Sequence, residues 1–130
     1  MKEVWKFLKE CHVYYLATID GETPRVRPFG TIEIFEDKLY IQTGKSKNVS
    51  KQIQANPNVE LCGMKGDEWI RVSGKLIRDD SIEAKRDMLD KNPNLKSMYS
   101  AEDDNTEVLY FEDGIATIYS FTKEPEIIKF

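Results

Sequence analysis

Short segments with the alternation of β-strands, separated by turn residues, constrain the fold of this chain more than any other feature. In the segment 69–78, Ile70, Val72 and Leu76 alternate with polar side chains, which predicts a strand with one buried and one polar face. Further segments rich in β-branched and aromatic residues are 13–20, 25–35, 39–43 and 58–65. We therefore expect an antiparallel sheet.

Turn signals predict how these strands connect. Glu36-Asp37 gives a tight connection between two strands, and Asp113-Gly114 is the strongest hairpin signal in the chain. Pro28 cannot donate a ladder hydrogen bond, so its strand is expected at an edge, at a bulge or against a ligand.

Three helical segments complete the pattern. Residues 2–11 carry apolar side chains at helical spacing, residues 46–55 begin with Ser46 as N-cap and end before a proline, and residues 81–98 are helical up to a break near Pro93. Six or seven strands with hairpin connections predict a mainly β protein. We expect a small antiparallel barrel in a single domain over residues 1–130.

Composition excludes several classes of protein. The chain has 130 residues with 19 Lys+Arg against 23 Asp+Glu, a net charge of −4, so it lacks the positive charge that non-specific nucleic-acid binding requires. No apolar run approaches the ~20 residues that span a bilayer. The N-terminal segment carries charges throughout, unlike a secretory signal. We expect a cytoplasmic protein with no nucleic-acid and no membrane partner.

Cysteine and histidine are too sparse for a metal site. Cys11 and Cys62 lie far apart in the sequence and His12 is the single histidine, whereas a zinc site needs about four clustered ligands. No metal site is expected, and no side chain stands out as a catalytic acid or base.

Charge is unevenly distributed along the chain. Between Lys38 and Val59 there are lysines at 38, 45, 47 and 51 and no acidic residue, and between Thr23 and Ile32 there are two arginines and no acid. The segment 101–114, in contrast, holds six acidic residues and no basic one. Positive charge is thus gathered around one strand and one strand-to-helix junction.

The strand-to-helix junction reads TGKSKNVSK over residues 43–51. Lys45 and Lys47 at a helix N-terminus oppose the helix dipole, at a cost of about 0.3–1 kcal/mol each. Lysines together with free N–H groups at that end predict an anion site, and a phosphate brings negative charge and strong acceptor oxygens to it. A solvated basic helix start is the alternative.

A second candidate is the strand RVRPF, residues 25–29. Arg25, Arg27 and Phe29 share one strand face, where two guanidiniums can clamp a phosphate or a flat, electron-rich ring. A salt-bridged barrel exterior is the alternative. Trp69, on the polar face of its own strand, is a third candidate, for a dimer contact or for stacking on a ring.

Three ordered motifs carry a resemblance to a known family. They are YLATIDGETPRVRPFG (15–30), LYIQTGKSKNVSKQIQANPNVELC (39–62) and EWIRVSGKL (68–76). In order, spacing and residue types they resemble the pyridoxamine 5′-phosphate oxidase-related FMN-binding split-barrel family, in particular its short NimC/NimA-like members. The resemblance implies a six-stranded split barrel that forms a homodimer, with one FMN in each of two clefts at the dimer interface.

The resemblance also implies site residues, position by position. The matching positions are Arg25, Val26, Arg27, Pro28 and Phe29 along the flavin ring toward the phosphate, Gln42 and Thr43 in the following strand, Ser46, Lys47 and Asn48 at the phosphate-binding helix start, and Trp69 where many relatives have a flavin-facing glutamine.

The implied function is that of an FMN-dependent oxidoreductase, which passes electrons to a small substrate such as a nitroaromatic or quinone-like compound. True pyridoxamine 5′-phosphate oxidases end in a segment with arginine and tryptophan that builds the cofactor and substrate sites. This chain ends in PEIIKF, so we do not expect vitamin B6 oxidation. A non-catalytic flavin-binding or stress-response module and a deazaflavin-dependent reductase stay open as alternatives.

Overall fold

Alternating strands build one antiparallel sheet in the computed structural model, which describes all residues, 1–130. The sheet has eight strands in the order β2-β1-β5-β6-β7-β4-β3, with β8 paired to β7. The strands are β1 (Tyr14–Asp20), β2 (Thr23–Phe29), β3 (Glu33–Phe35), β4 (Lys38–Gly44), β5 (Asn58–Lys65), β6 (Glu68–Asp79), β7 (Thr106–Ser120) and β8 (Glu126–Lys129). The helices are α1 (Lys2–Cys11), α2 (Asn48–Ala55) and α3 (Ile82–Lys91), with a 3₁₀ helix, η1, at Pro93–Ser97.

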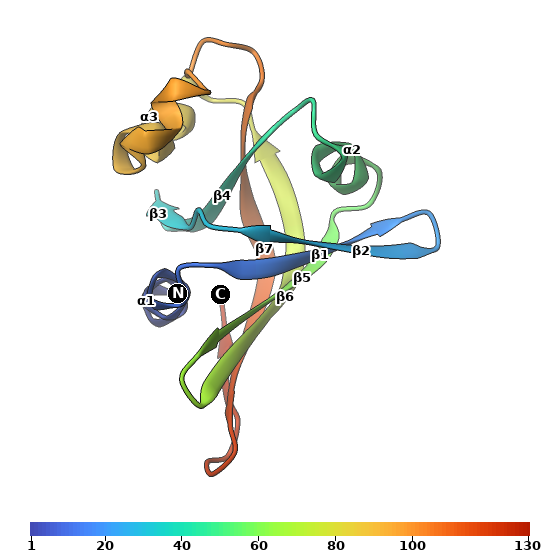
Figure 1. The fold of residues 1–130 in the computed structure, drawn as a ribbon, viewed down its shortest axis with the longest axis vertical. Helices are drawn as coiled ribbons and strands as arrows, with labels where there is room; N and C mark the ends of the chain where they lie inside the picture. The colour runs from blue at the N-terminus through green and yellow to red at the C-terminus, as the bar shows by residue number, and fades with distance from the viewer.

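The sheet curls into a split barrel, which confirms the predicted mainly β fold class. Six strands have seven or more residues, and β3 and β8 add two short ones. The two end strands of the sheet are β2 and β3. They follow each other in the chain but do not pair with each other. Figure 1 shows β1 and β2 crossing the long β6 and β7 strands, with α1, α2 and α3 around the outside.

The core fills the inside of this barrel. Ile70, Val72 and Leu76 on β6 are at most 2% exposed, as their alternation predicted. Val4 and Leu8 of α1 pack into the same cluster, because helical spacing puts them on one face of the helix. No helix has the length and apolar character that crossing a membrane requires.

The predicted hairpin at Asp113-Gly114 is wrong, since β7 continues through both residues. Its pairing with β6 shifts register at Gly74, where Asp113 and Gly114 stand opposite a single residue. Asp113 has a positive φ of 57° and Gly114 does not, whereas a type I′ turn needs positive φ at both central residues. Gly114 exchanges two backbone hydrogen bonds with Phe130, of 2.9 and 2.8 Å.

Two smaller predictions are corrected by local geometry, and a third is confirmed. The strand expected over 25–35 divides into β2 and β3, with residues 30–32 unpaired between them. The N-cap of α2 is Lys47, not Ser46, and no side chain caps it. The helical break predicted near Pro93 is confirmed, since α3 ends at Lys91 with Asn92 as its C-cap and Pro93 begins the separate turn η1.

The strand β2 lies at the edge of the sheet, as Pro28 predicted. It pairs only with β1, where Pro28 faces Tyr15 and Pro24 faces Ile19. A proline is tolerated at such an edge because its missing N–H falls on the unpaired side. One long side of β2 is therefore free of backbone partners and available to a neighbouring group.

Candidate functional site

A cavity of about 710 Å³ lies between the edge strand β2 and the helix α2. Arg25 and Arg27 reach it from β2, while Lys47, Lys51 and Gln52 line it from α2 and its N-cap. The period of two along β2 puts both arginines on the face that meets α2, and their β1 partners Thr18 and Leu16 point the same way.

A second cavity, of about 380 Å³, continues from the first. Arg27, Lys47 and Val49 line both cavities and mark where they meet. The second cavity extends along Phe29 and Thr31, and its outer wall is the η1 region. Its lining holds no carboxylate: Arg27, Pro28, Phe29, Gly30, Thr31, Gln42, Thr43, Lys47, Val49, Asn92, Asn94, Leu95, Met98 and Tyr99.

The N-terminus of α2 opens at this junction with unsatisfied donors. The backbone N–H groups of Asn48 and Val49 have no acceptor within the chain, and the N-cap Lys47 supplies none. Lys47 and Asn48 are exposed, whereas Val49 is only 5% exposed, so the N–H of Asn48 belongs to the more accessible residue. A helix N-terminus with free N–H groups and a lysine favours an anion.

Positive charge at the two cavities is only partly balanced. Arg25 pairs with Asp20 at 3.3 Å, in contact with solvent. Arg27, Lys47 and Lys51 form no ion pair. Burial, and secondarily the nearby Arg25, lowers the pKa of the Arg27 guanidinium below its usual value, although a guanidinium stays protonated at neutral pH. The arrangement therefore lacks a negative partner that a bound anion would supply.

Neutral acceptors hold Arg27 in place. Its Nη1 donates to the Thr18 hydroxyl at 2.7 Å and to the Leu16 carbonyl at 3.2 Å, and its Nη2 donates to Gln52 Oε1 at 2.6 Å. Thr18 also donates to Gln52 Oε1 at 2.6 Å. Arg27 is thus anchored to both β1 and α2 while its charge stays uncompensated.

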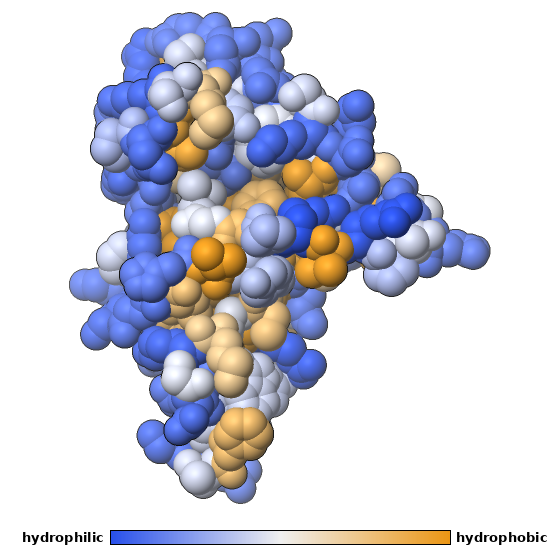
Figure 2. Space-filling view, viewed as in Figure 1, coloured by the Kyte–Doolittle hydropathy of each residue, from blue (hydrophilic) through white to orange (hydrophobic).

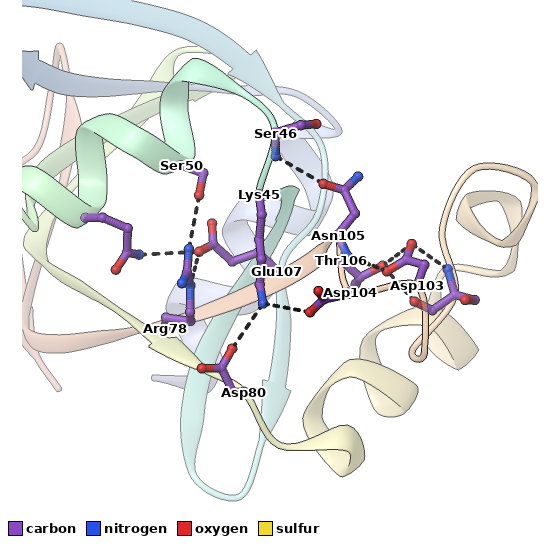
Figure 3. A network of polar contacts seen from close by, with 12 residues as sticks. Lys45, Ser46, Ser50, Arg78, Asp80, Asp103, Asp104, Asn105, Thr106 and Glu107 are labelled. Carbon is purple, nitrogen blue, oxygen red and sulfur yellow. Dashed lines mark hydrogen bonds and ion pairs between the residues drawn. The ribbon is translucent and has the colours of Figure 1, made fainter.

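The acidic segment lies beside the lysine-rich junction, and Figure 3 shows how the two meet. Lys45 Nζ lies 3.6 Å from Asp80 and 3.7 Å from Asp104. Its charge is therefore paired with these carboxylates, and it lines neither cavity. The Ser46 N–H donates to Asn105 Oδ1 at 3.1 Å. Of the two lysines that precede α2, Lys47 is therefore the one that lines the cavities.

Asp103 orders the loop that supplies Asn105. Although burial opposes it, hydrogen bonds from the backbone of Thr106, Ser100 and Asn105 lower the pKa of Asp103 to about 2. These donors lie 2.7, 3.0 and 2.8 Å from its carboxylate oxygens. The loop is a fixed support for the residues that precede α2.

A buried carboxylate fastens α2 to the sheet. Glu107 on β7 is fully buried and forms an ion pair with Arg78 of β6. Gln54 of α2 donates to the same carboxylate at 3.3 Å, and Arg78 reaches the hydroxyl of Ser50 on α2 at 3.5 Å (Figure 3). The position of the helix N-terminus thus depends on a charge pair at the opposite side of α2.

Most of the predicted site residues come together at the two cavities. Arg25, Val26, Arg27, Lys47 and Asn48 line the first, and Arg27, Pro28, Phe29, Gln42, Thr43 and Lys47 line the second. Ser46 and Trp69 line neither. Sequence reasoning missed Lys51 and Gln52, which the helical repeat from Lys47 and Asn48 puts on the same face of α2, and it missed the η1 wall, for which the sequence has no signal.

Trp69 lies on a different surface, at the start of the β6 strand. It stacks on Tyr119 with ring centroids 5.4 Å apart and an interplanar angle of 12°, and it also contacts the exposed ring of Phe121. The strand register puts the half-buried Trp69 and Tyr119 on one sheet face with exposed apolar residues. We call this set the outer apolar face: Tyr15, Ile19, Val26, Met64, Trp69, Tyr119 and Ile127.

Figure 2 shows apolar side chains over the middle of one face of the molecule and toward its lower tip, with hydrophilic groups around them. Val26 is 67% exposed and Met64 59%, values that isolated apolar side chains reach but that several on one face seldom reach in a monomer. No group of three or more His, Cys, Asp or Glu side chains lies close enough together to hold a metal ion.

Comparison with known proteins gives a family and several relatives. The family model described as pyridoxamine 5′-phosphate oxidase matches residues 1–109. No curated protein matches the chain. Among solved structures, the chain is similar to a NimC/NimA family protein from Clostridium acetobutylicum, with 46% identity and a TM-score of 0.97 over 100% of this chain and 92% of that one.

Two more distant structures share the fold. The general stress protein 26 of Bacillus anthracis is 24% identical, with a TM-score of 0.75 over 99% of this chain and 98% of that one. A protein described as F420 reductase is 17% identical, with a TM-score of 0.62 over 82% of this chain and 90% of that one.

Proposed function

Because the chain belongs to the pyridoxamine 5′-phosphate oxidase family and is 46% identical to a NimC/NimA family protein, we propose that it is an FMN-binding oxidoreductase that reduces a small nitroaromatic or quinone-like substrate. One observation carries the proposal. Three cations without acidic partners, Arg27, Lys47 and Lys51, line the first cavity beside the unsatisfied N–H groups of a helix N-terminus.

The donor set fits the phosphate of FMN. Lys47 and the N–H groups of Asn48 and Val49 offer a cation and two backbone donors at one point, and a phosphate dianion accepts all three. Lys51 lies one helical turn from Lys47 and adds positive charge along the same cavity. We assign Ser46 a supporting role here through its hydrogen bond to Asn105.

The second cavity suits a flat ring. Pro28 and Phe29 form one wall, Gln42 and Thr43 contribute a polar floor, and the junction with the first cavity holds Arg27. When bound, FMN would supply the redox chemistry, and the chain would bind it, orient it and limit access of water. Arg27 would bring a positive charge close to a flavin ring in the second cavity, and this charge would favour electron-rich forms of the bound ligand.

We further propose a homodimer that joins through the outer apolar face. Exposed apolar side chains on β2, β1, β5 and β8, with Glu60 and Arg71 among them on the same face, form the surface that a second copy would cover, and aromatic residues such as Trp69 and Tyr119 anchor interfaces of this kind. In such a dimer Trp69 of one copy would approach the cavities of the other. The proposed dimer would explain why Trp69, a predicted site residue, lines no cavity of its own chain.

Trp69→Ala tests the dimer. We expect it to raise the dimer dissociation constant by about 30-fold, since truncating an interface aromatic costs about 2 kcal/mol, and to weaken FMN binding in parallel. Sedimentation velocity over a range of concentrations measures the first quantity, and quenching of FMN fluorescence the second. Phe35→Ala, at the opposite edge of the sheet, is the matched control. A wild-type protein that sediments as a monomer would refute the proposed dimer.

FMN titration tests the cofactor itself. We expect the protein to bind FMN in a 1:1 ratio to the chain and to bind riboflavin at least about 100-fold more weakly, because riboflavin lacks the phosphate. Addition of NADH or NADPH with a nitroaromatic acceptor then measures turnover. Equal affinity for FMN and riboflavin contradicts the phosphate assignment. FMN binding without turnover would favour a flavin-binding module, and binding of coenzyme F420 in preference to FMN would favour a deazaflavin-dependent reductase.

A further inference from the structure

The guanidinium of Arg27 uses only part of its hydrogen-bonding capacity within the chain. Both Nη1 hydrogens are satisfied, by the Leu16 carbonyl and the Thr18 hydroxyl, and Nη2 donates one hydrogen to Gln52. A guanidinium has five N–H donors in a fixed plane. The Nε–H and the second Nη2–H therefore have no partner in the chain.

These two remaining donors lie on the same edge of the guanidinium plane. The adjacent acceptors Thr18 Oγ1 and Gln52 Oε1, 2.6 Å apart, occupy the end of the group between Nη1 and Nη2. The side edge, formed by Nε–H and Nη2–H, is the edge that recognises two neighbouring acceptor atoms at once. Arg27 lines both cavities, so this edge is available where they meet.

The side chain of Gln52 forms no other hydrogen bond that would explain its orientation. Its Oε1 accepts from Thr18 and from Arg27, and Thr18, which is 2% exposed, is itself fixed in the sheet. A carboxylate in place of this amide would hold the same geometry but would neutralise Arg27. An amide oxygen accepts the hydrogen bond from Arg27 without neutralising it, so the positive charge of Arg27 stays available to a ligand.

We propose that Gln52 is a positioning residue, which with Thr18 holds Arg27 so that its Nε–H and Nη2–H edge is presented to a pair of acceptor atoms of the bound flavin nucleotide. The inference rests on the proposed function for the identity of the ligand. It adds that recognition by Arg27 is bidentate and depends on a residue of α2 that need not touch the ligand through its own polar atoms.

The first test uses the protein without any ligand. In ¹⁵N-labelled protein, the rotation of the Arg27 guanidinium about its Nε–Cζ bond is measured by NMR, with Arg27→Lys to assign the signal. We expect Gln52→Met, of similar length but without the acceptor, to speed this rotation by at least about tenfold. Gln52→Glu, which keeps the acceptor, should leave it slow. The exposed Arg86 is the internal control.

The second test measures coupling to the ligand. We expect Gln52→Met to raise the FMN dissociation constant by about tenfold in the wild-type background and by less than about twofold in an Arg27→Met background, because the amide acts only through the arginine. A purely structural role would give the same loss in both backgrounds. If Gln52→Met does not fold, Thr18→Val removes the neighbouring acceptor and should show the same pattern.

The outcomes separate this inference from the proposed function. Unchanged Arg27 rotation in Gln52→Met, or equal losses of FMN affinity in the two backgrounds, overturns the positioning role. A wild-type protein that fails to bind FMN overturns the proposed function, while the ligand-free NMR measurement still decides whether Gln52 holds Arg27.

Discussion

Arg78→Met is expected to lower the free energy of unfolding by about 3–5 kcal/mol. The substitution leaves the Glu107 carboxylate, which is fully buried, without its cation. One oxygen of that carboxylate already has no hydrogen-bond partner, so the remaining contact with Gln54 cannot compensate. Urea denaturation followed by circular dichroism, at one fixed protein concentration, measures the loss.

An exposed ion pair provides the matched control. Arg86 pairs with Glu102 at 2.8 Å, but both side chains are about 60% exposed, at 59% and 63%. Arg86→Met should therefore cost no more than about 1 kcal/mol. The double variant Arg78→Met with Glu107→Leu should recover most of the stability, because it removes the buried charge as well. A single Arg78→Met variant as stable as Arg86→Met would disprove the assigned role of the buried pair.

Lys47→Glu is expected to weaken FMN binding by at least about 100-fold, or about 2.8 kcal/mol. The change removes the cation of the N-cap residue, directly before the free N–H groups of Asn48 and Val49, and puts a carboxylate where the phosphate is proposed to bind. Lys47 is exposed and forms no ion pair, so the fold should not change. Isothermal titration calorimetry of the purified variant with FMN gives the affinity directly.

Two further variants separate local charge from net charge. Lys123→Glu makes the same change of charge in the exposed loop after β7 and should leave FMN affinity within about twofold of wild type. Lys47→Arg keeps the cation and should lose less than about tenfold. Equal affinities for Lys47→Glu and Lys123→Glu would remove Lys47 from the phosphate site. The thermal midpoint of each variant shows whether the fold is intact.

The arginines of the site were predictable because they depend on a local rule. The period of two along a strand puts Arg25 and Arg27 on one face in any register, and the structure bears this out. Gln52 was not predictable, because its hydrogen bond to Arg27 joins residues 25 positions apart in sequence. The η1 wall of the second cavity depends likewise on how α3 packs against the barrel.

The strand pattern predicted most of the fold, and its one large error has a physical cause. An Asp-Gly pair indicates a position where the backbone can adopt positive φ. Both a hairpin turn and a β-bulge need such a position. The choice between them depends on long-range pairing. Here β6 runs alongside both halves of β7, and Gly114 is paired with Phe130 at the far end of the chain.

The misassigned N-cap has a similar origin. Ser46 is a favourable capping residue, but its N–H is taken by Asn105, which belongs to a loop 59 positions away. With this contact Ser46 stays outside the helix. The helix α2 then begins one residue later than expected, with Lys47 as its N-cap. The same displacement leaves the first N–H groups of α2 without a side-chain partner, which is the feature that an anion site requires.

The two prolines of β2 have a consequence for how copies of this protein meet. Pro24, Val26 and Pro28 have their amide positions on the unpaired side of the strand, and only Val26 among them carries an N–H. A strand that approached this edge would meet one backbone N–H donor, whereas a β-ladder needs a regular series of such donors. The open edge therefore resists intermolecular sheet extension and the aggregation that follows from it, even in a crowded cell. Any association would then use the faces of the sheet, where side chains and not backbone groups decide which partner fits.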